Sequence, residues 1–205
     1  MSIITIIGSG NMASAIGTRA AKHGHTVEVM GRNTTKVRAL ADEIGNGAIV
    51  GPFGETPAGD IVILALLYSG VLDVVRHYGS ALSGKILVDI TNPFNAEGSG
   101  LVTTSGDSAS QQIAGAAPKG THVVKAFNSI FGGVLAEDKS MDAFLAGDDA
   151  EAKGRVAEFL ESMDMRPLDA GGLEATYLLE WIAIFLVDLA RSGAGFEIAL
   201  GAGVL

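Results

Sequence analysis

Two patterns of hydrophobic positions alternate along the chain: short continuous apolar runs, and longer stretches with helical spacing. Continuous runs rich in β-branched residues are typical of strands buried on both faces of a parallel sheet. The runs cover residues 3–7, 26–30, 48–50, 60–66, 85–90 and 122–127. Helical spacing, with apolar residues three and four positions apart, covers residues 11–23, 33–44, 70–78 and 108–117. This alternation predicts an α/β fold with a doubly wound, mostly parallel sheet and right-handed crossovers.

The last third of the chain continues the alternation less regularly. Residues 143–146 predict an edge strand, residues 148–163 a capped helix, and residues 166–169 a final strand. Residues 173–191 predict the longest helix, which is apolar over more than one face. We therefore expect it to pack both on its own domain and on a partner subunit. A glycine-rich, apolar tail follows at residues 193–205.

Composition and charge narrow the class of protein. The chain has 205 residues, 48% hydrophobic and 18% charged, and no cysteine, so it can bury a core but has no disulfide or thiolate site. Residues 1–136 carry nine acids and nine bases, whereas residues 137–205 carry fourteen acids and five bases. This acidic end argues against nucleic-acid binding. The first apolar run is too short for a signal peptide, and residues 178–189 contain Glu180 and Asp188, so we expect a cytoplasmic protein without a membrane span.

A glycine fingerprint follows the first predicted strand. Its pattern is G-x-G-x-x-A, from Gly8 to Ala13, between a strand and a helix. Gly8 permits the tight turn, Gly10 leaves room for a pyrophosphate, and the first helical turn offers free N–H groups to phosphate oxygens. The alternative is a glycine turn of another α/β protein. The predicted phosphate-binding residues are Gly8, Ser9, Gly10, Asn11 and Met12.

The end of the second strand decides which dinucleotide is bound. An acidic residue there would bind the ribose 2′-hydroxyl and repel a 2′-phosphate, but this chain has Gly31 and Arg32 instead. Arg32, Asn33 and Lys36 form a cationic cluster at the start of a helix, which suits a 2′-phosphate. We therefore predict NADP(H) rather than NAD(H); the alternative is that Arg32 is a solvated arginine at an exposed turn.

The nicotinamide end of a dinucleotide lies over the carboxyl ends of the later strands. Apolar residues end or follow one of these strands and could contact the face of the nicotinamide ring. Asparagines follow two others and could bind the carboxamide of that ring. The candidates are Ala65, Leu66, Leu67, Asn92, Pro93 and Asn128. An Asn-Pro pair after a strand is also a common turn, so a purely structural role stays open for it.

No set of residues predicts a metal site or a catalytic acid and base. The four histidines are scattered, and no paired carboxylates or His-x-Glu motif occurs. Lys125 is the only base near the predicted cleft in the second half of the chain, and we expect it to be a surface lysine at a strand end. The loop at residues 97–107, with three glycines, is a candidate lid over the site.

Four segments resemble the deazaflavin-dependent NADP oxidoreductases, which move hydride between NADPH and an 8-hydroxy-5-deazaflavin. They are residues 6–12 (IIGSGNM) with Gly31 and Arg32, residues 89–95 (DITNPFN), residues 124–130 (VKAFNSI) and residues 166–171 (RPLDAG). The ferric-reductase domain of the six-transmembrane epithelial antigen proteins is similar in the same segments. The chain departs from the founding enzymes at Leu67 and Tyr68, where a proline and an aromatic residue are expected. It also lacks a histidine and a proline near residues 128–131.

The resemblance implies one Rossmann-like domain over residues 1–205, with a dinucleotide-binding core at 1–130 and an extension at 131–205. It also implies a homodimer, and NADP(H) held by Ser9, Gly10, Asn11, Met12, Gly31, Arg32 and Lys36. A second redox ring, a deazaflavin or flavin, would stack on the nicotinamide. Two function classes remain: an NADPH-dependent oxidoreductase with a small-molecule redox acceptor, and an NADPH-binding sensor or ferric or flavin reductase-like module without deazaflavin activity.

Overall fold

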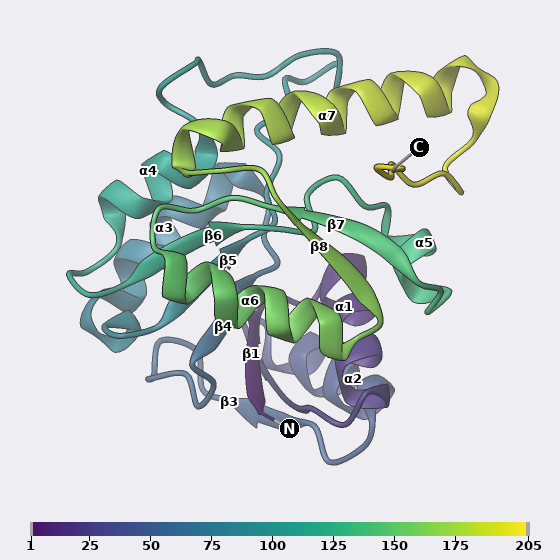
Figure 1. The fold of residues 1–205 in the computed structure, drawn as a ribbon. Helices are drawn as coiled ribbons and strands as arrows, with labels where there is room; N and C mark the ends of the chain where they lie inside the picture. The colour runs from purple at the N-terminus through teal and green to yellow at the C-terminus, as the bar shows by residue number, and fades with distance from the viewer. Residues whose placement is uncertain (1, 204–205) are drawn as a thin grey trace.

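A six-stranded parallel sheet forms the centre of the molecule in this computed structural model, which describes residues 2–203. The strand order is β3-β2-β1-β4-β5-β6, so the chain winds outward from β1 in both directions (Figure 1). The expected doubly wound α/β fold is therefore confirmed. The strands are β1 (Ile3–Ile7), β2 (Thr26–Met30), β3 (Ile49–Gly51), β4 (Ile61–Leu64), β5 (Ile86–Asp89) and β6 (His122–Lys125).

Helices cover both faces of this sheet, and each strand supplies alternate side chains to the two sides. Ile6 of β1 packs in the core beneath α1, α2 and α6, whereas Ile7 packs beneath α3 and α4. The first face carries α1 (Asn11–Lys22), α2 (Thr34–Ile44), α5 (Gly132–Ala136) and α6 (Ala150–Ser162); the second carries α3 (Tyr68–Tyr78) and α4 (Ala109–Ala116). Strands buried on both faces explain why their sequence runs are continuously apolar.

A second, two-stranded parallel sheet lies beside the main one. It pairs β7 (Met141–Leu145) with β8 (Met165–Asp169) around α6. The strand predicted at residues 143–146 therefore forms, but it is wrong as an edge strand of the main sheet, since β7 pairs along its length with β8. Only Ala146, just after β7, bridges to Lys125 of β6.

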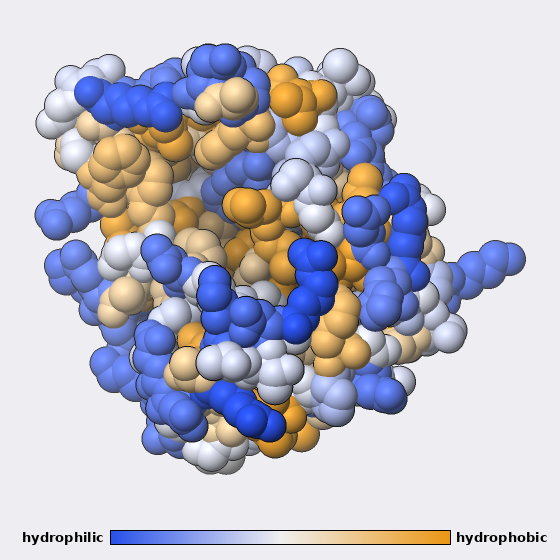
Figure 2. All heavy atoms as spheres, turned by 180° about the vertical axis from the view of Figure 1, so that it is seen from behind, coloured by the Kyte–Doolittle hydropathy of each residue, from blue (hydrophilic) through white to orange (hydrophobic). Residues whose placement is uncertain are grey.

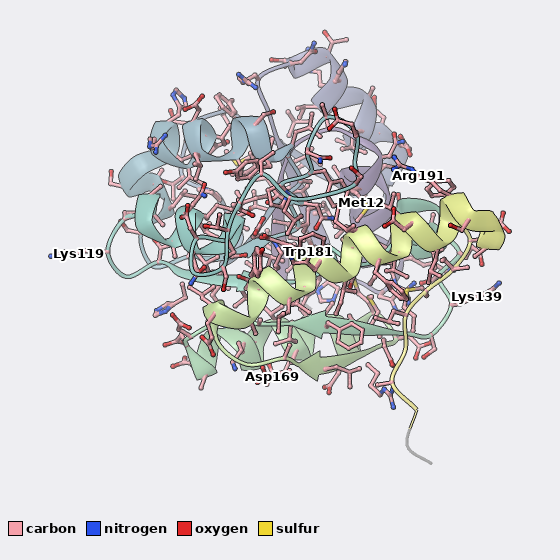
Figure 3. The ribbon with its side chains drawn as sticks, turned by 90° about the horizontal axis from the view of Figure 1, so that it is seen from above. Met12, Lys119, Lys139, Asp169, Trp181 and Arg191 are labelled. Atoms are coloured by element: carbon pink, nitrogen blue, oxygen red, sulfur yellow. The ribbon has the colours of Figure 1, made fainter. Side chains whose placement is uncertain are left out.

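The longest helix, α7 (Thr176–Leu189), lies across the carboxyl ends of the main-sheet strands (Figures 1 and 3). A 3-10 turn at Leu173–Ala175 precedes it, and a wide turn at Ala190–Ala194 ends it where Gly193 has a φ of 115°. One face of α7 is buried on the domain, and the opposite face exposes four large apolar side chains, Leu178, Trp181, Phe185 and Leu189. Among residues 2–203 no helix has the length and apolar character needed to cross a membrane.

Candidate functional site

The glycine turn between β1 and α1 has a shape that only glycine permits at its first position. Gly8 has a φ of 136°, and a Cβ there would lie 2.1 Å from the carbonyl oxygen of Ala65, the residue after β4. Gly10, which precedes α1, has nothing within 4 Å of the place where a Cβ would lie. No side chain caps the helix at this end. The turn therefore presents open space and the positive end of a helix dipole, as a pyrophosphate requires.

One cavity extends from this turn toward the end of β2. Its volume is about 500 Å3, and its lining includes Gly8, Ser9, Gly10, Gly31, Arg32, Asn33 and Lys36. The Asn33 side chain accepts a hydrogen bond from the backbone N–H of Lys36 at 3.0 Å and so caps α2. Arg32 is exposed and forms no ion pair with any residue in the described part of the chain. These features fit the 2′-phosphate end of NADP(H).

Sequence reasoning missed Phe53, which lines the same cavity together with Ser69, Gly70 and Val74. The Phe53 ring stacks on His77 with centroids 4.9 Å apart and planes 12° apart. Phe53 therefore gives the cavity a flat aromatic wall of the kind that an adenine ring contacts. The sequence offered a signal, because Phe53 lies two residues after the end of β3 and the carboxyl ends of parallel strands build such sites.

A second cavity of about 450 Å3 continues from the first over β4 and β5. Both cavities are lined by Gly10, Ala65, Leu66 and Leu67, so they form one continuous groove. The second is completed by Asn11, Met12, Tyr68, Ile90, Thr91, Asn92 and Phe94. Figure 2 shows a hollow with largely apolar walls in the middle of the face opposite to that of Figure 1. A groove of this form, with one cationic end and one apolar end, fits an extended dinucleotide.

The structure brings Asn92 and Asn128 together, and their side-chain amides are already used in hydrogen bonds within the protein. Asn92 Nδ2 donates to the Asn128 carbonyl oxygen at 2.7 Å, and Asn128 Nδ2 donates to Asn92 Oδ1 at 3.0 Å and to the Leu179 carbonyl oxygen at 2.8 Å. Asn92 lines the second cavity, whereas Pro93 and Asn128 do not. The pair therefore ties the loops after β5 and β6 to α7.

The backbone between Lys125 and Asn128 is constrained. Phe127 has a φ of 61° although it is not glycine, and its side chain is buried among the core residues under α6. A bulky residue in the left-handed region is strained and persists only when its surroundings hold it. This turn fixes the position of Asn128.

Lys125 is not a surface lysine, and that expectation is wrong. Its side chain is fully buried, with Nζ 2.8 Å from Asp89 Oδ2, 3.2 Å from Glu180 Oε1 and 2.9 Å from the Thr91 carbonyl oxygen. Burial raises the pKa of Asp89, but Lys125, Ser110 and the Thr91 N–H outweigh it and hold that pKa below its usual value. Burial raises the pKa of Glu180, and Lys125 opposes this only in part. The chain thus contains a buried charged cluster that local sequence does not reveal.

The loop after β5 contributes Ile90, Thr91, Asn92 and Phe94 to the wall of the second cavity, and its later residues contact the chain just after α7. Phe94 bridges to Leu101, and Arg191 Nη1 at the end of α7 donates to the carbonyl oxygens of Glu97 and Gly98, each at 3.2 Å. Figure 3 looks down on this edge and labels Met12 on α1 with Trp181 and Arg191 on α7. The tail returns as well, with Phe196 against Phe131 at 5.3 Å. Its last two residues, 204 and 205, lie outside the described part.

The strand order, the glycine turn and the groove define a Rossmann-like dinucleotide-binding protein. Residues 3–93 match the model of the family described as NADP oxidoreductase coenzyme F420-dependent, so the resemblance seen in the sequence is confirmed over this segment. The matched segment contains the glycine turn and Arg32, and the match indicates an NADP-dependent oxidoreductase.

Individual relatives and solved structures are similar to most of this chain. Metalloreductase STEAP3 of Rattus norvegicus is 30% identical over 190 residues, which are 90% of this chain and 37% of the relative. The chain thus spans little more than a third of that protein. The solved structure of SMa0349, a hypothetical protein from Sinorhizobium meliloti, is 27% identical with a TM-score of 0.78 and coverage of 86% and 88% of the two chains. A structure from Arthrobacter sp. FB24, provisionally named an F420-dependent NADP-reductase, shares the fold over 100% of both chains, at 22% identity and a TM-score of 0.84.

Proposed function

We propose that the protein binds NADP(H) in the groove and transfers hydride between it and a second redox ring. One observation carries this proposal: two connected cavities run from the exposed Arg32 and Lys36, past the glycine turn, to an apolar end over β4 and β5. The turn from Gly8 to Met12 would hold the pyrophosphate, and Gly31, Arg32, Asn33 and Lys36 would hold the 2′-phosphate end. Ala65, Leu66 and Leu67 would pack along the dinucleotide, and Asn92, fixed by Pro93 and Asn128, would face the nicotinamide carboxamide.

The nature of the second cavity supports a ring as hydride acceptor. No Asp, Glu, His, Lys or Arg lines this cavity, and the hydroxyl of Tyr68 donates to Gln112 Oε1 at 2.8 Å. Hydride transfer between two conjugated rings needs alignment and exclusion of water rather than a protein proton donor. When bound, the nicotinamide would supply the hydride, while Leu66, Leu67 and Phe94 would keep water away. A deazaflavin or a flavin is the acceptor that we propose.

A stopped-flow experiment tests the acceptor. The protein loaded with NADPH is mixed separately with the deazaflavin coenzyme, FMN and a ferric chelate, and NADPH absorbance is followed. Rapid loss with the deazaflavin or with FMN supports the proposal. Loss of NADPH with none of the three, after binding of NADPH has been verified, contradicts it and favours a sensor that binds NADPH without turnover.

A ferric reductase is the second candidate, and the similarity to a metalloreductase over 90% of this chain favours it. In this case NADPH would be lost with the ferric chelate and not with the deazaflavin or with FMN. The same three arms of the stopped-flow experiment separate the two candidates. Both need a compartment that supplies NADPH, and we propose the cytoplasm.

We also propose that the protein is a homodimer through α7. Leu178, Trp181, Phe185 and Leu189 follow one another at helical spacing, and Leu178 and Phe185 are 64% and 53% exposed. A contiguous exposed apolar stripe of this kind is typical of a protein–protein interface. A second copy of the same stripe would be self-complementary, as a two-fold interface requires.

A further inference from the structure

A buried cluster of three charged side chains lies directly behind the second cavity. Asp89 ends β5, Lys125 ends β6 and Glu180 projects from the buried face of α7; the side chains of all three have no exposed surface. Charged groups are costly to remove from water, and apolar residues of similar size are often as stable in their place. A contribution to stability is therefore a weak explanation for the cluster, and its connections are more informative.

The cluster holds both ends of the loop that joins β5 to α4, whose first residues line the cavity. At the first end, the Thr91 N–H donates to Asp89 Oδ1 at 2.8 Å, and Lys125 Nζ donates to the Thr91 carbonyl oxygen at 2.9 Å. At the second end, Glu180 Oε2 accepts a hydrogen bond from the Thr103 hydroxyl at 3.3 Å, and Oε1 accepts one from the Ala109 N–H at 3.0 Å. Thr91 itself lines the cavity, so the wall of the cavity and the loop share one set of anchors.

Glu180 is the member of the cluster that joins separate elements. Its carboxylate contacts Lys125 on β6, Thr103 on the loop and the first amide of α4, while its backbone belongs to α7. One residue earlier, the Leu179 carbonyl accepts from Asn128, and Arg191, in the turn just after α7, holds the tip of the loop at Glu97 and Gly98. Helix α7 therefore fastens the loop at two points, and Glu180 is the buried one.

The charges of the cluster do not balance, because two carboxylates share one lysine. Asp89 has Lys125, Ser110 Oγ at 2.6 Å and the Thr91 N–H as donors. Glu180 has the longer contact to Lys125, one amide and one hydroxyl. In this arrangement Asp89 and Lys125 form the shorter ion pair, and Glu180 is a second carboxylate that has no cation of its own. Burial raises the pKa of Glu180, because removal from water disfavours the ionised carboxylate. Its contacts with the surrounding residues, rather than favourable hydration, therefore hold this side chain in place.

We propose that Glu180 is a positioning residue that fixes residues 96–107, part of the loop between β5 and α4, to α7 beside the second cavity, with the Lys125–Asp89 pair as its fixed base. This deepens the proposed function, because it rests on the second cavity being the nicotinamide site. Glu180 touches no residue of the glycine turn or of the Arg32 end. Its loss is therefore expected to loosen the loop without weakening NADPH binding.

Hydrogen–deuterium exchange of the loop amides tests the proposal without any need for activity. In Glu180→Ala, we expect the protected amides of residues 96–107 to exchange at least about tenfold faster than in the wild type, since hydrogen bonds to a charged group are lost. Amides of β1 and β4 serve as the internal reference and are expected to exchange as in the wild type. Glu180→Gln keeps an acceptor for Ala109 and a polar partner for Thr103, so we expect exchange within about twofold of the wild type.

Two further variants keep the test decisive. Thr103→Val removes only the hydroxyl on the loop side, leaves all buried charges in place and should raise loop exchange about threefold, even if Glu180→Ala fails to fold. Asp188→Ala removes an exposed carboxylate from the same helix and should change nothing. In a single-turnover assay with a working acceptor, we expect Glu180→Ala to slow hydride transfer about tenfold while the NADPH Kd stays within about threefold.

Wild-type exchange of the loop in folded Glu180→Ala, or in Thr103→Val, overturns the proposal. Exchange in Glu180→Gln as fast as in Glu180→Ala also overturns it, since the side chain of Gln can make the same contacts. A failure of the proposed function is recognised separately. It appears as absent NADPH binding in the wild type, whereas the exchange experiment still reports whether Glu180 holds the loop.

Discussion

Gly8 and Gly10 stand two residues apart in the same turn and need glycine for different reasons. At Gly8 the chain itself excludes a side chain, since φ is 136° and the Ala65 carbonyl oxygen occupies the position of a Cβ. At Gly10 the protein leaves that position empty. The space above Gly10 is therefore available to something other than this chain, and the pyrophosphate of a dinucleotide is the group that we propose for it.

The two glycines yield opposite predictions. Gly10→Ala is expected to unfold at the wild-type temperature and to bind NADPH at least about tenfold more weakly, because the new methyl group meets only the ligand. Gly8→Ala is expected to lose stability, because its methyl group meets the backbone of Ala65, just after β4. Thermal unfolding and NADPH titration of both variants check this. Wild-type NADPH affinity in Gly10→Ala would contradict the placement of the pyrophosphate.

Arg32 is exposed at the end of β2 and lines the first cavity. If its guanidinium binds the 2′-phosphate, Arg32→Ala should lose about 2 kcal/mol of NADPH binding, or about thirtyfold, and almost none of NADH binding. Titration with both nucleotides measures the ratio of the two affinities. Arg38, an exposed arginine further along α2 and outside the lining of the cavity, provides the matched control as Arg38→Ala. An unchanged NADPH:NADH ratio in Arg32→Ala would refute the assignment.

The sequence predicted the local structure around a residue correctly where its contacts lie within a few positions along the chain, and failed where they come from distant elements. The glycine turn, Arg32 and the Asn33 cap lie within single strand–turn–helix units, and the sequence places them correctly. Lys125 was misjudged because Asp89 and Glu180, its partners, come from β5 and α7, far away in the chain. Lys125 stands between the apolar residues Val123, Val124, Ala126 and Phe127; a charge in such a run is a sign of a buried partner but does not identify that partner.

Helices α1 and α5 are joined at their ends by a small ionic group. Asp138, just after α5, contacts Lys22 and lies 2.9 Å from His23 Nε2 and 3.5 Å from Arg19 Nε. Hydrogen bonds from Lys22 and His23 lower the pKa of Asp138 from 3.8 to about 2. The folded state thus favours ionised Asp138 more than the unfolded state does, so the stabilisation is complete above pH 4 and is lost as the pH falls from about 4 to about 2.

Thermal unfolding measured between pH 5 and pH 2 checks the effect of Asp138. We expect Asp138→Asn to have a lower Tm than the wild type at pH 5, and the difference to shrink as the pH approaches 2. Asp73→Asn, at an exposed carboxylate on α3, is the control and should leave the curve unchanged. A Tm difference that stays constant over this range would show that the contact acts through packing rather than through charge.

Element boundaries followed the hydrophobic pattern closely, but pairing between distant elements did not. The helix predicted at residues 108–117 is α4, with Ser108 and Gln111 forming a capping box. The strand predicted at 143–146 forms, yet its main partner is β8, which follows a complete helix later. Periodicity reports whether a residue is buried and says nothing of which strand lies beside it, so the small sheet could not be derived from the pattern alone.

Within residues 2–203, one side of α7 has no covering element. The proposed dimer predicts a mass of twice 21.0 kDa in solution. Phe185→Asp places a charge in the middle of the exposed stripe and is expected to give a monomer, because a buried unpaired charge is costly at an interface. Light scattering after size exclusion measures the mass, with Asp188→Ala as the control on the same helix. A monomeric wild type at micromolar concentration would contradict the dimer.

The small sheet beside β6 also affects how copies of this protein can associate. A parallel sheet has two open edges, and each unpaired edge is a template to which another chain can add a strand. At β6, Lys125 exchanges backbone hydrogen bonds of 2.8 and 3.1 Å with Ala146, so this edge is already covered at the carboxyl end of the strand. At the other side, β3 is only three residues long. Growth of an aggregate by edge-to-edge addition is therefore blocked at one end of the sheet and has only a short template at the other.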